Sequence, residues 1–114
     1  MGTIIKTIPE FDRRAKRLAK KYHSLKTDLQ QFVSSLCKTP MQGNNLGNGV
    51  YKVRIAIASK GGGKSGGGRI VTYTVKESEA DCYVVTLLTI YDKSEIANVT
   101  DAYIKELIIQ ANAK

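Results

Sequence analysis

The sequence is poor in side chains that bind metals or act as nucleophiles: among 114 residues it has one histidine and two cysteines. Cys37 and Cys82 have neither the C-x-x-C spacing nor the histidine neighbours of a zinc site, so we predict no metal and place both in the core. His23 falls in a polar turn between two helical patterns, which argues against a serine or cysteine nucleophile activated by histidine.

Long apolar runs are also missing, since none exceeds four residues. A membrane-spanning helix needs about 20 consecutive apolar residues, and the apolar part of a signal peptide needs about 7 to 15. We therefore expect no membrane association and a cytoplasmic protein. A chain of this length buries one core, which predicts a single domain over residues 1–114, and it leaves no room for a large cofactor cleft, so we expect no cofactor.

Acidic residues are absent between Asp28 and Glu77, although the whole chain has 18 basic and 10 acidic residues. Residues 1–73 hold 14 basic and 3 acidic residues, a net charge of +11. The middle segment carries five basic residues without a carboxylate: Lys52, Arg54, Lys60, Lys64 and Arg69. Such a stretch predicts a polyanionic partner, for which nucleic acid is the natural candidate.

Apolar periodicity predicts an α+β domain with the element order β-α-α-β-β-β-α. The patterns indicate strands at residues 4–8, 50–58, 69–75 and 82–91, a loop at 38–49 and a turn at 77–81. They indicate helices from Pro9 to residue 22, from Leu25 over about 13 residues with Ser24 as N-cap, and from Thr100 to about Asn112. We expect the first two helices to form an antiparallel hairpin on one face of an antiparallel sheet, with residues 82–91 as its central strand.

The strand at residues 50–58 alternates in polarity. Tyr51, Val53 and Ile55 fall on one face, and Lys52 and Arg54 fall on the other. Residues two apart on a strand lie roughly 7 Å apart on the same surface, so two cations at this spacing can span one phosphate group. A solvated sheet face would explain the same pattern, but no nearby carboxylate is available to pair with these charges.

The segment from Ser59 to Gly68 contains six glycines and two lysines. It departs from a phosphate-binding loop of nucleotide hydrolases, because Ala58 stands where the first glycine is required and a strand rather than a helix follows. Two interpretations remain open. The segment is either a flexible connection between strands or a contact to nucleic acid through Lys60 and Lys64.

Three segments together resemble the RelE and HigB toxins of type II toxin-antitoxin modules: G-V-Y-K-V-R-I at 49–55, G-K-S-G-G-G-R-I-V at 63–71 and L-L-T-I-Y-D-K-S-E at 87–95. The resemblance spans nearly the whole chain and implies a RelE-like microbial RNase fold. It also implies a metal-independent endoribonuclease that cleaves messenger RNA in the ribosomal A site. The implied partners are a cognate antitoxin, the ribosome and messenger RNA.

The resemblance implies site residues by position. Lys52 and Arg54 match two basic active-site residues on one strand, Arg69 matches the arginine that opens the next, Lys93 matches a basic residue after the last strand, and Tyr91 matches an aromatic that stacks on a base. The arginines cannot titrate near neutrality and suit phosphate binding. Crowding by them favours the neutral form of Lys52, which makes it the candidate base, with Lys93 as candidate acid. Further candidates for RNA phosphate contacts are Lys60, Lys64, Arg13 and Arg17.

Two alternatives come from other functional classes. Some members of the wider superfamily, the ParE-like toxins, inhibit DNA gyrase and cleave no RNA, but the basic matches at 52, 54, 69 and 93 argue against this function. A non-catalytic RNA-binding domain would share the charge, but the sequence lacks the aromatic-rich sheet typical of such domains.

Overall fold

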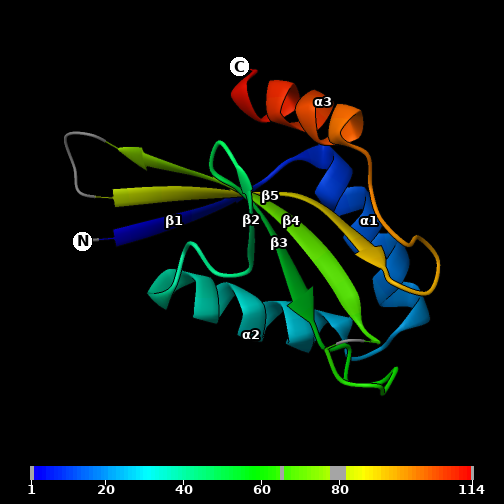
Figure 1. Ribbon diagram of the computed structural model, residues 1–114. Helices are drawn as coiled ribbons and strands as arrows, with labels where there is room; N and C mark the ends of the chain where they lie inside the picture. Colours follow the sequence, from blue (N-terminus) through cyan, green and yellow to red (C-terminus); the bar gives the residue numbers. More distant parts are fainter. Residues whose placement is uncertain (1, 65, 78–81, 114) are drawn as a thin grey trace.

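The computed structural model describes residues 2–64, 66–77 and 82–113, and the turn predicted at 77–81 therefore lies largely outside the described residues. The described residues form the predicted α+β fold, with one short strand more than predicted. The strands are β1 (Gly2–Thr7), β2 (Asn44–Gly47), β3 (Val50–Ile55), β4 (Gly68–Glu77) and β5 (Cys82–Asp92), and the helices are α1 (Pro9–Lys21), α2 (Leu25–Lys38) and α3 (Asp101–Asn112) (Figure 1).

The strands form one sheet in the order β1-β5-β4-β3-β2. The antiparallel meander β3-β4-β5 is confirmed. The prediction of a wholly antiparallel sheet is wrong, because β1 pairs in parallel with β5. The prediction that residues 82–91 form the central strand is also inexact, since β5 is an inner strand but β4 occupies the middle.

The additional strand β2 lies inside the segment predicted to be a loop, and it pairs antiparallel with β3. A two-residue turn, Asn48-Gly49, joins the two strands, and both turn residues have positive φ angles, 54° and 82°. Asn-Gly is the preferred pair for this type of hairpin turn because asparagine and glycine tolerate that conformation at low cost. The hairpin signal was therefore present in the sequence.

The two faces of the sheet have different coverings. From Val85 to Asp92 every residue of β5 is buried, so both faces of this strand are covered. One face carries Thr89 and Val50 and lies against α3, whose Tyr103 hydroxyl is 3.0 Å from the Thr89 hydroxyl. Residues of the other face belong to one core cluster with residues of α1 and α2. The strands contribute Val53, Ile55, Ile70 and Ile90 to this cluster, and the helices contribute Leu18, Leu25, Phe32 and Leu36.

The helix boundaries lie close to the predicted ones. Thr100 caps α3 by accepting a hydrogen bond from the Tyr103 amide. Ser24 occupies the N-cap of α2, but its hydroxyl donates to the Asp28 carboxylate and makes no side-chain cap bond. The antiparallel pairing of α1 with α2 stays a prediction.

Two further observations concern the absences noted in the sequence. The prediction that both cysteines lie in the core is wrong, because Cys37 is exposed and Cys82 is half-buried. Cys37 comes from the last turn of α2 and lies beside β1 at the edge of the sheet, where its carbonyl accepts a hydrogen bond from the Thr3 hydroxyl.

No helix in the described part of the chain is long and apolar enough to cross a bilayer.

Candidate active site

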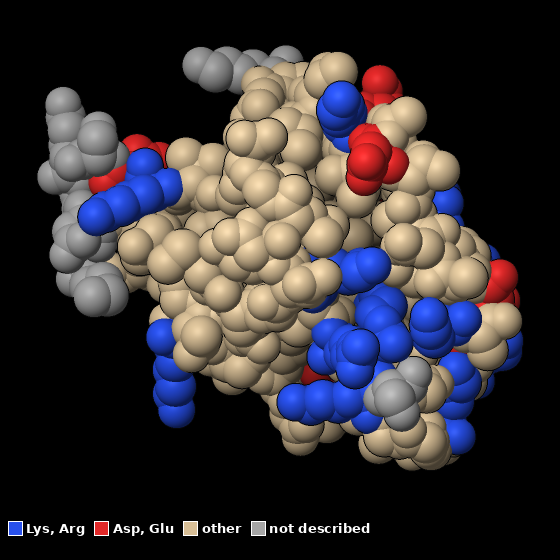
Figure 2. All heavy atoms as spheres, in the orientation of Figure 1, with Lys and Arg blue, Asp and Glu red and all other residues tan. Residues whose placement is uncertain are grey.

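A cavity of about 690 Å³, here called the basic cavity, opens beside β3, β4 and the end of β5. None of the described residues that line it is acidic. Figure 2 shows lysine and arginine side chains gathered on the side of the molecule where the glycine-rich segment lies in Figure 1. The basic side chains that line the cavity are Lys52, Arg54, Lys64, Arg69 and Lys93, and Tyr91 joins them.

The register of the sheet explains why residues far apart in the sequence meet here. Arg54 on β3 lies directly opposite Arg69 on β4, and Arg69 lies directly opposite Tyr91 on β5. Directly opposite side chains point to the same face, and like charges in this position destabilise a sheet. Two opposed arginines without a lining carboxylate therefore form a site that an anion would stabilise.

Arg69 is held more firmly than the sequence suggests. The sequence places it at the start of a strand, and the structure shows that only 7% of the residue is exposed. One terminal nitrogen of its guanidinium donates to the carbonyl oxygens of Lys64 and Gly68, both at 3.1 Å. Arg69 thus has a fixed position in the wall of the basic cavity, and it ties the glycine-rich segment to β4.

Lys52 and Tyr91 share a partner that the sequence analysis does not identify. The Lys52 ammonium lies 3.1 Å from Oδ1 of Asn98, and the Tyr91 hydroxyl lies 3.4 Å from the same oxygen. Burial raises the pKa of Tyr91, and the positive charge of Arg69 offsets part of this effect. Tyr91 therefore stays protonated near neutral pH, so it is no base, and its hydroxyl can donate a hydrogen bond. Only 2% of Tyr91 is exposed. The predicted stacking of its ring on an RNA base is therefore wrong for this structure, because the ring is packed inside the protein.

Lys93 and Lys64 are, like Arg54, exposed cations of the basic cavity, and both lie at its rim. The Lys93 amide donates to the Gly67 carbonyl at 3.2 Å, which joins the end of β5 to the glycine-rich segment. The Lys93 ammonium lies 3.4 Å from the Ala97 carbonyl, a long contact that a stronger acceptor can replace.

The sequence does not identify the residues of one wall of the basic cavity, which belong to the segment before β3. Gln42, Gly43 and Asn44 line the cavity next to Lys52. Gly43 has a φ angle of +97°, and a Cβ atom there would lie 2.7 Å from the Lys52 carbonyl oxygen. Glycine at this position therefore allows the hairpin to approach β3 closely.

Three residues predicted to contact RNA phosphates do not line the basic cavity. Arg13 is bound to the Glu10 carboxylate, and Arg17 is bound to Glu95 at 3.0 Å. The Lys60 ammonium is bound to the Asp92 carboxylate at 2.6 Å. Each of these cations already has an acidic partner, in contrast to the arrangement in the cavity.

Asp92 is the centre of a buried network directly behind the basic cavity. Its side chain is fully buried and accepts hydrogen bonds from the Lys60 ammonium, the Tyr22 hydroxyl at 2.5 Å and the Ser94 amide and hydroxyl at 2.9 and 2.7 Å. Burial by itself would raise the pKa of Asp92, but these hydrogen bonds outweigh it and hold the pKa far below its usual range. The network fastens the glycine-rich segment and the end of α1 to the end of β5.

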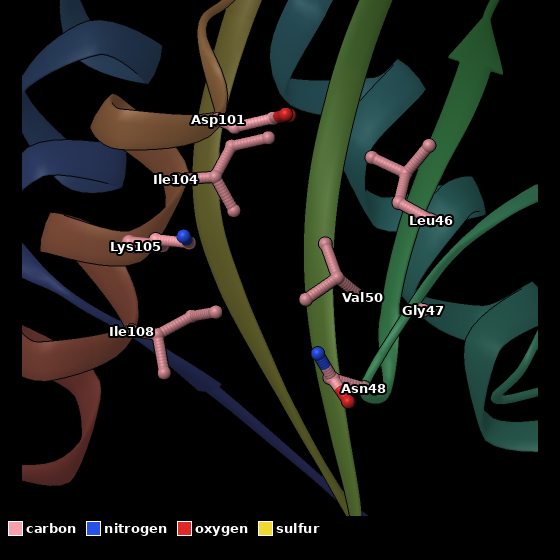
Figure 3. Close-up of a pocket in the computed structure, with 8 residues that line it drawn as sticks. All are labelled: Leu46, Gly47, Asn48, Val50, Asp101, Ile104, Lys105 and Ile108. Atoms are coloured by element: carbon pink, nitrogen blue, oxygen red, sulfur yellow. The ribbon is translucent and has the colours of Figure 1, made fainter.

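A second, smaller cavity of about 200 Å³ lies between α3 and the β2–β3 hairpin. Figure 3 shows Ile104 and Ile108 of α3 pointing towards Val50 and Leu46 across this space. Asp101 and Lys105 are the charged residues of its lining. The apolar lining suits packing rather than chemistry, so the basic cavity, with its charged lining, is the better candidate active site of the two.

The basic cavity provides donors and proton-transfer groups but no metal ligands. Among the described residues, no group of three histidine, cysteine, aspartate or glutamate side chains could hold a metal ion. Arginines that cannot lose a proton, lysines that can, and a protonated tyrosine are suited to phosphoryl chemistry on a polyanion.

The chain matches the model of a known protein family. The model of the family described as "RelE toxin of RelE / RelB toxin-antitoxin system" matches residues 10–113, and these include every residue of the basic cavity. No curated protein matches the chain.

Proposed function

Because the chain belongs to the RelE toxin family, a family of toxin-antitoxin toxins that generally inhibit translation as RNases, we propose that it cleaves messenger RNA in the ribosomal A site. The basic cavity is the proposed active site. The observation that supports it best is the convergence of five basic side chains and Tyr91 on one cavity that no described acidic residue lines.

The proposed reaction uses the RNA itself as nucleophile. The ribose 2′-oxygen attacks the adjacent phosphorus, and the bond from phosphorus to the 5′-oxygen breaks, which leaves a 2′,3′-cyclic phosphate and a 5′-hydroxyl. Lys52, in its neutral form, takes the proton of the 2′-hydroxyl, and Lys93 gives a proton to the departing 5′-oxygen. Arg54 and Arg69 stabilise the charge that grows on the phosphate oxygens. Tyr91, whose ring is buried, offers its hydroxyl to the phosphate.

The buried position of Arg69 suits this role. A donor that is held in place before the substrate arrives needs no reorganisation when charge develops, and electrostatic stabilisation is then most effective. Its contacts to Lys64 and Gly68 are made to backbone oxygens, which fix the guanidinium in the cavity wall. Arg54, which is exposed, adds a second charge on the same row of the sheet.

The proposed partner is an antitoxin of the type named in the family description. Residues 1–73 carry a net charge of +11, so an acidic or amphipathic antitoxin segment would be attracted to the basic cavity and to the surface of α1 and Lys93 beside it. An antitoxin that contacts only α3 would contradict direct neutralisation of the site.

The decisive experiment is a cleavage assay with purified ribosomes and one defined messenger RNA. We expect the parent chain to produce fragments with 2′,3′-cyclic phosphate and 5′-hydroxyl ends, and Arg54→Ala to lose most of this activity. Lys26→Ala is the matched control, because Lys26 is an exposed cation of α2 that does not line the basic cavity. Growth arrest with intact messenger RNA and broken DNA would instead indicate gyrase inhibition, and RNA binding without cleavage would indicate a non-catalytic domain.

A further inference from the structure

We propose that Asn98 is a positioning residue that holds Lys52 and Tyr91 in their working arrangement, an inference that rests on the function proposed above. Its Oδ1 atom accepts from three donors: the Val99 amide at 3.0 Å, the Lys52 ammonium at 3.1 Å and the Tyr91 hydroxyl at 3.4 Å. The Val99 backbone amide can only donate a hydrogen bond. It therefore identifies the atom of Asn98 that faces the three donors as the amide oxygen and not the amide nitrogen.

The segment that carries Asn98 is itself well anchored between β5 and α3. The amides of Glu95 and Ile96 both donate to the Asp92 carbonyl at 3.0 Å. Ile96 and Val99 are partly buried against the core on either side of Asn98, and Thr100 caps α3 directly afterwards. The amide oxygen is therefore presented from a fixed backbone, although Asn98 itself is exposed.

The need for such a residue follows from the charges around Lys52. A lysine side chain has four rotatable carbon–carbon bonds, and repulsion by neighbouring cations drives its ammonium out of a crowded site. An acceptor is needed to hold it in place. The titratable or charged groups that share the basic cavity with Lys52 are Arg54 on β3, Arg69 on β4, Tyr91 on β5, and Lys64 and Lys93 at the rim.

A neutral acceptor suits a general base better than a carboxylate does. A neutral lysine amine has two N–H groups and one lone pair, and the contact to Asn98 uses one of these N–H groups. Asn98 can therefore hold Lys52 in either protonation state and leaves the lone pair free for the proton of the 2′-hydroxyl. A carboxylate at position 98 would instead favour the ammonium form and would repel the RNA phosphate.

The test is single-turnover cleavage on saturating ribosomes, measured across pH, for Asn98→Ala and Asn98→Asp. Loss of groups that orient others in a site commonly costs about 10- to 100-fold, and we expect Asn98→Ala to lower the cleavage rate by this factor with ribosome affinity unchanged. Asn98→Asp should move the rising limb of the pH–rate profile to higher pH, because the added carboxylate favours the ammonium form of Lys52. Asn112→Asp is the matched control, since it makes the same chemical change at the exposed end of α3.

The outcomes separate this inference from the proposed function. A parent chain that cleaves, together with Asn98 variants that keep its rate and pH profile, overturns the role of Asn98 and leaves the function intact. If Asn98→Asp lowers the cleavage rate by the same factor at every pH, Asn98 has only a structural role, and the inference is also overturned. A parent chain that cleaves no RNA overturns both proposals.

Discussion

Two groups of cations in this molecule differ in what surrounds them. The basic cavity brings together five basic side chains, and no described acidic residue lines it. Four cations of α1 have carboxylate partners instead: Arg13 and Arg14 are bound to Glu10, and Arg17 and Lys21 are bound to Glu95. The difference indicates that missing carboxylates, rather than positive charge alone, mark the functional surface.

The comparison has a physical basis. Bringing like charges together costs free energy, and binding of an anionic ligand offsets this repulsion. Cations that have carboxylate partners in the native state lose part of their attraction for a polyanion, because binding must compete with the existing pair. We therefore expect substitutions in the basic cavity to change activity strongly and substitutions on α1 to change it little.

The largest effect is expected for Arg69→Ala compared with Arg17→Ala. Removal of one donor to a developing oxyanion costs a factor of roughly 10² to 10³ in rate, and Arg69→Ala should show such a loss in the ribosome assay. It should also lower the free energy of unfolding by about 1 to 3 kcal/mol, because two backbone oxygens lose a buried partner. Arg17→Ala should keep a near-parental rate and melting temperature. Equal losses in both variants would contradict the distinction between the two groups of cations.

Asp92→Asn tests the buried ion pair between Lys60 and Asp92. Breaking a buried ion pair by removing one partner costs about 3 kcal/mol or more, because the other charge is left without compensation. We expect a loss of this size in urea unfolding at pH 7. Asp12→Asn is the control, since Asp12 is an exposed residue of the first turn of α1. A parental stability for Asp92→Asn would show that Lys60 reaches solvent when its partner is lost.

The ion pair between Lys60 and Asp92 should make the protein less stable at acidic pH than at neutral pH. The folded pKa of Asp92 lies below the unfolded value of about 3.9, so its carboxylate stabilises the native state above that pH. This contribution is lost as the pH falls below about 4 and onward towards the folded pKa. Parent and Asp92→Asn should therefore differ most at neutral pH and converge on acidification, as measured by denaturant unfolding at stepwise lower pH. A difference that stays constant with pH would mean that shape rather than charge causes the loss.

Local patterns predicted the parts of the fold that depend on neighbouring residues. The alternation of Lys52 and Arg54 with Val53 placed both cations on the correct face of β3, and Thr100 was correctly identified as the cap of α3. Pairing between distant segments is not encoded in this way. The parallel contact of β1 with β5 joins Gly2 to Cys82, and no local pattern specifies the direction of such a pair.

The same limit applies to the candidate site. Of the nine residues proposed from the sequence, six line the basic cavity, because a strand pattern and family motifs locate them. Charge alone suggests the other three. Two of them have partners that only the fold reveals, since Arg17 is separated from Glu95 by 78 positions in the chain, and Lys60 from Asp92 by 32. Arg13 binds Glu10 three positions away on the same helix, a pair that helical spacing could have indicated. Asn98 is a further case, since an asparagine between a strand and a helix is typical of a turn and carries no signal of its distance to Lys52.

The smallest expected effect concerns the two lysines of the glycine-rich segment, which the sequence treats as equivalent. Lys64 is exposed at the rim of the basic cavity, whereas the Lys60 side chain is mostly buried against Asp92. Each lost phosphate contact lowers the slope of log affinity against log salt by roughly 0.7 to 0.9, and we expect this change in ribosome binding for Lys64→Ala. Lys60→Ala should leave the slope unchanged and lower thermal stability instead, because it leaves the Asp92 carboxylate buried without its cation. If both variants changed the slope equally, Lys60 would release Asp92 on binding, and the contrast between the two groups of cations would hold only for the free protein.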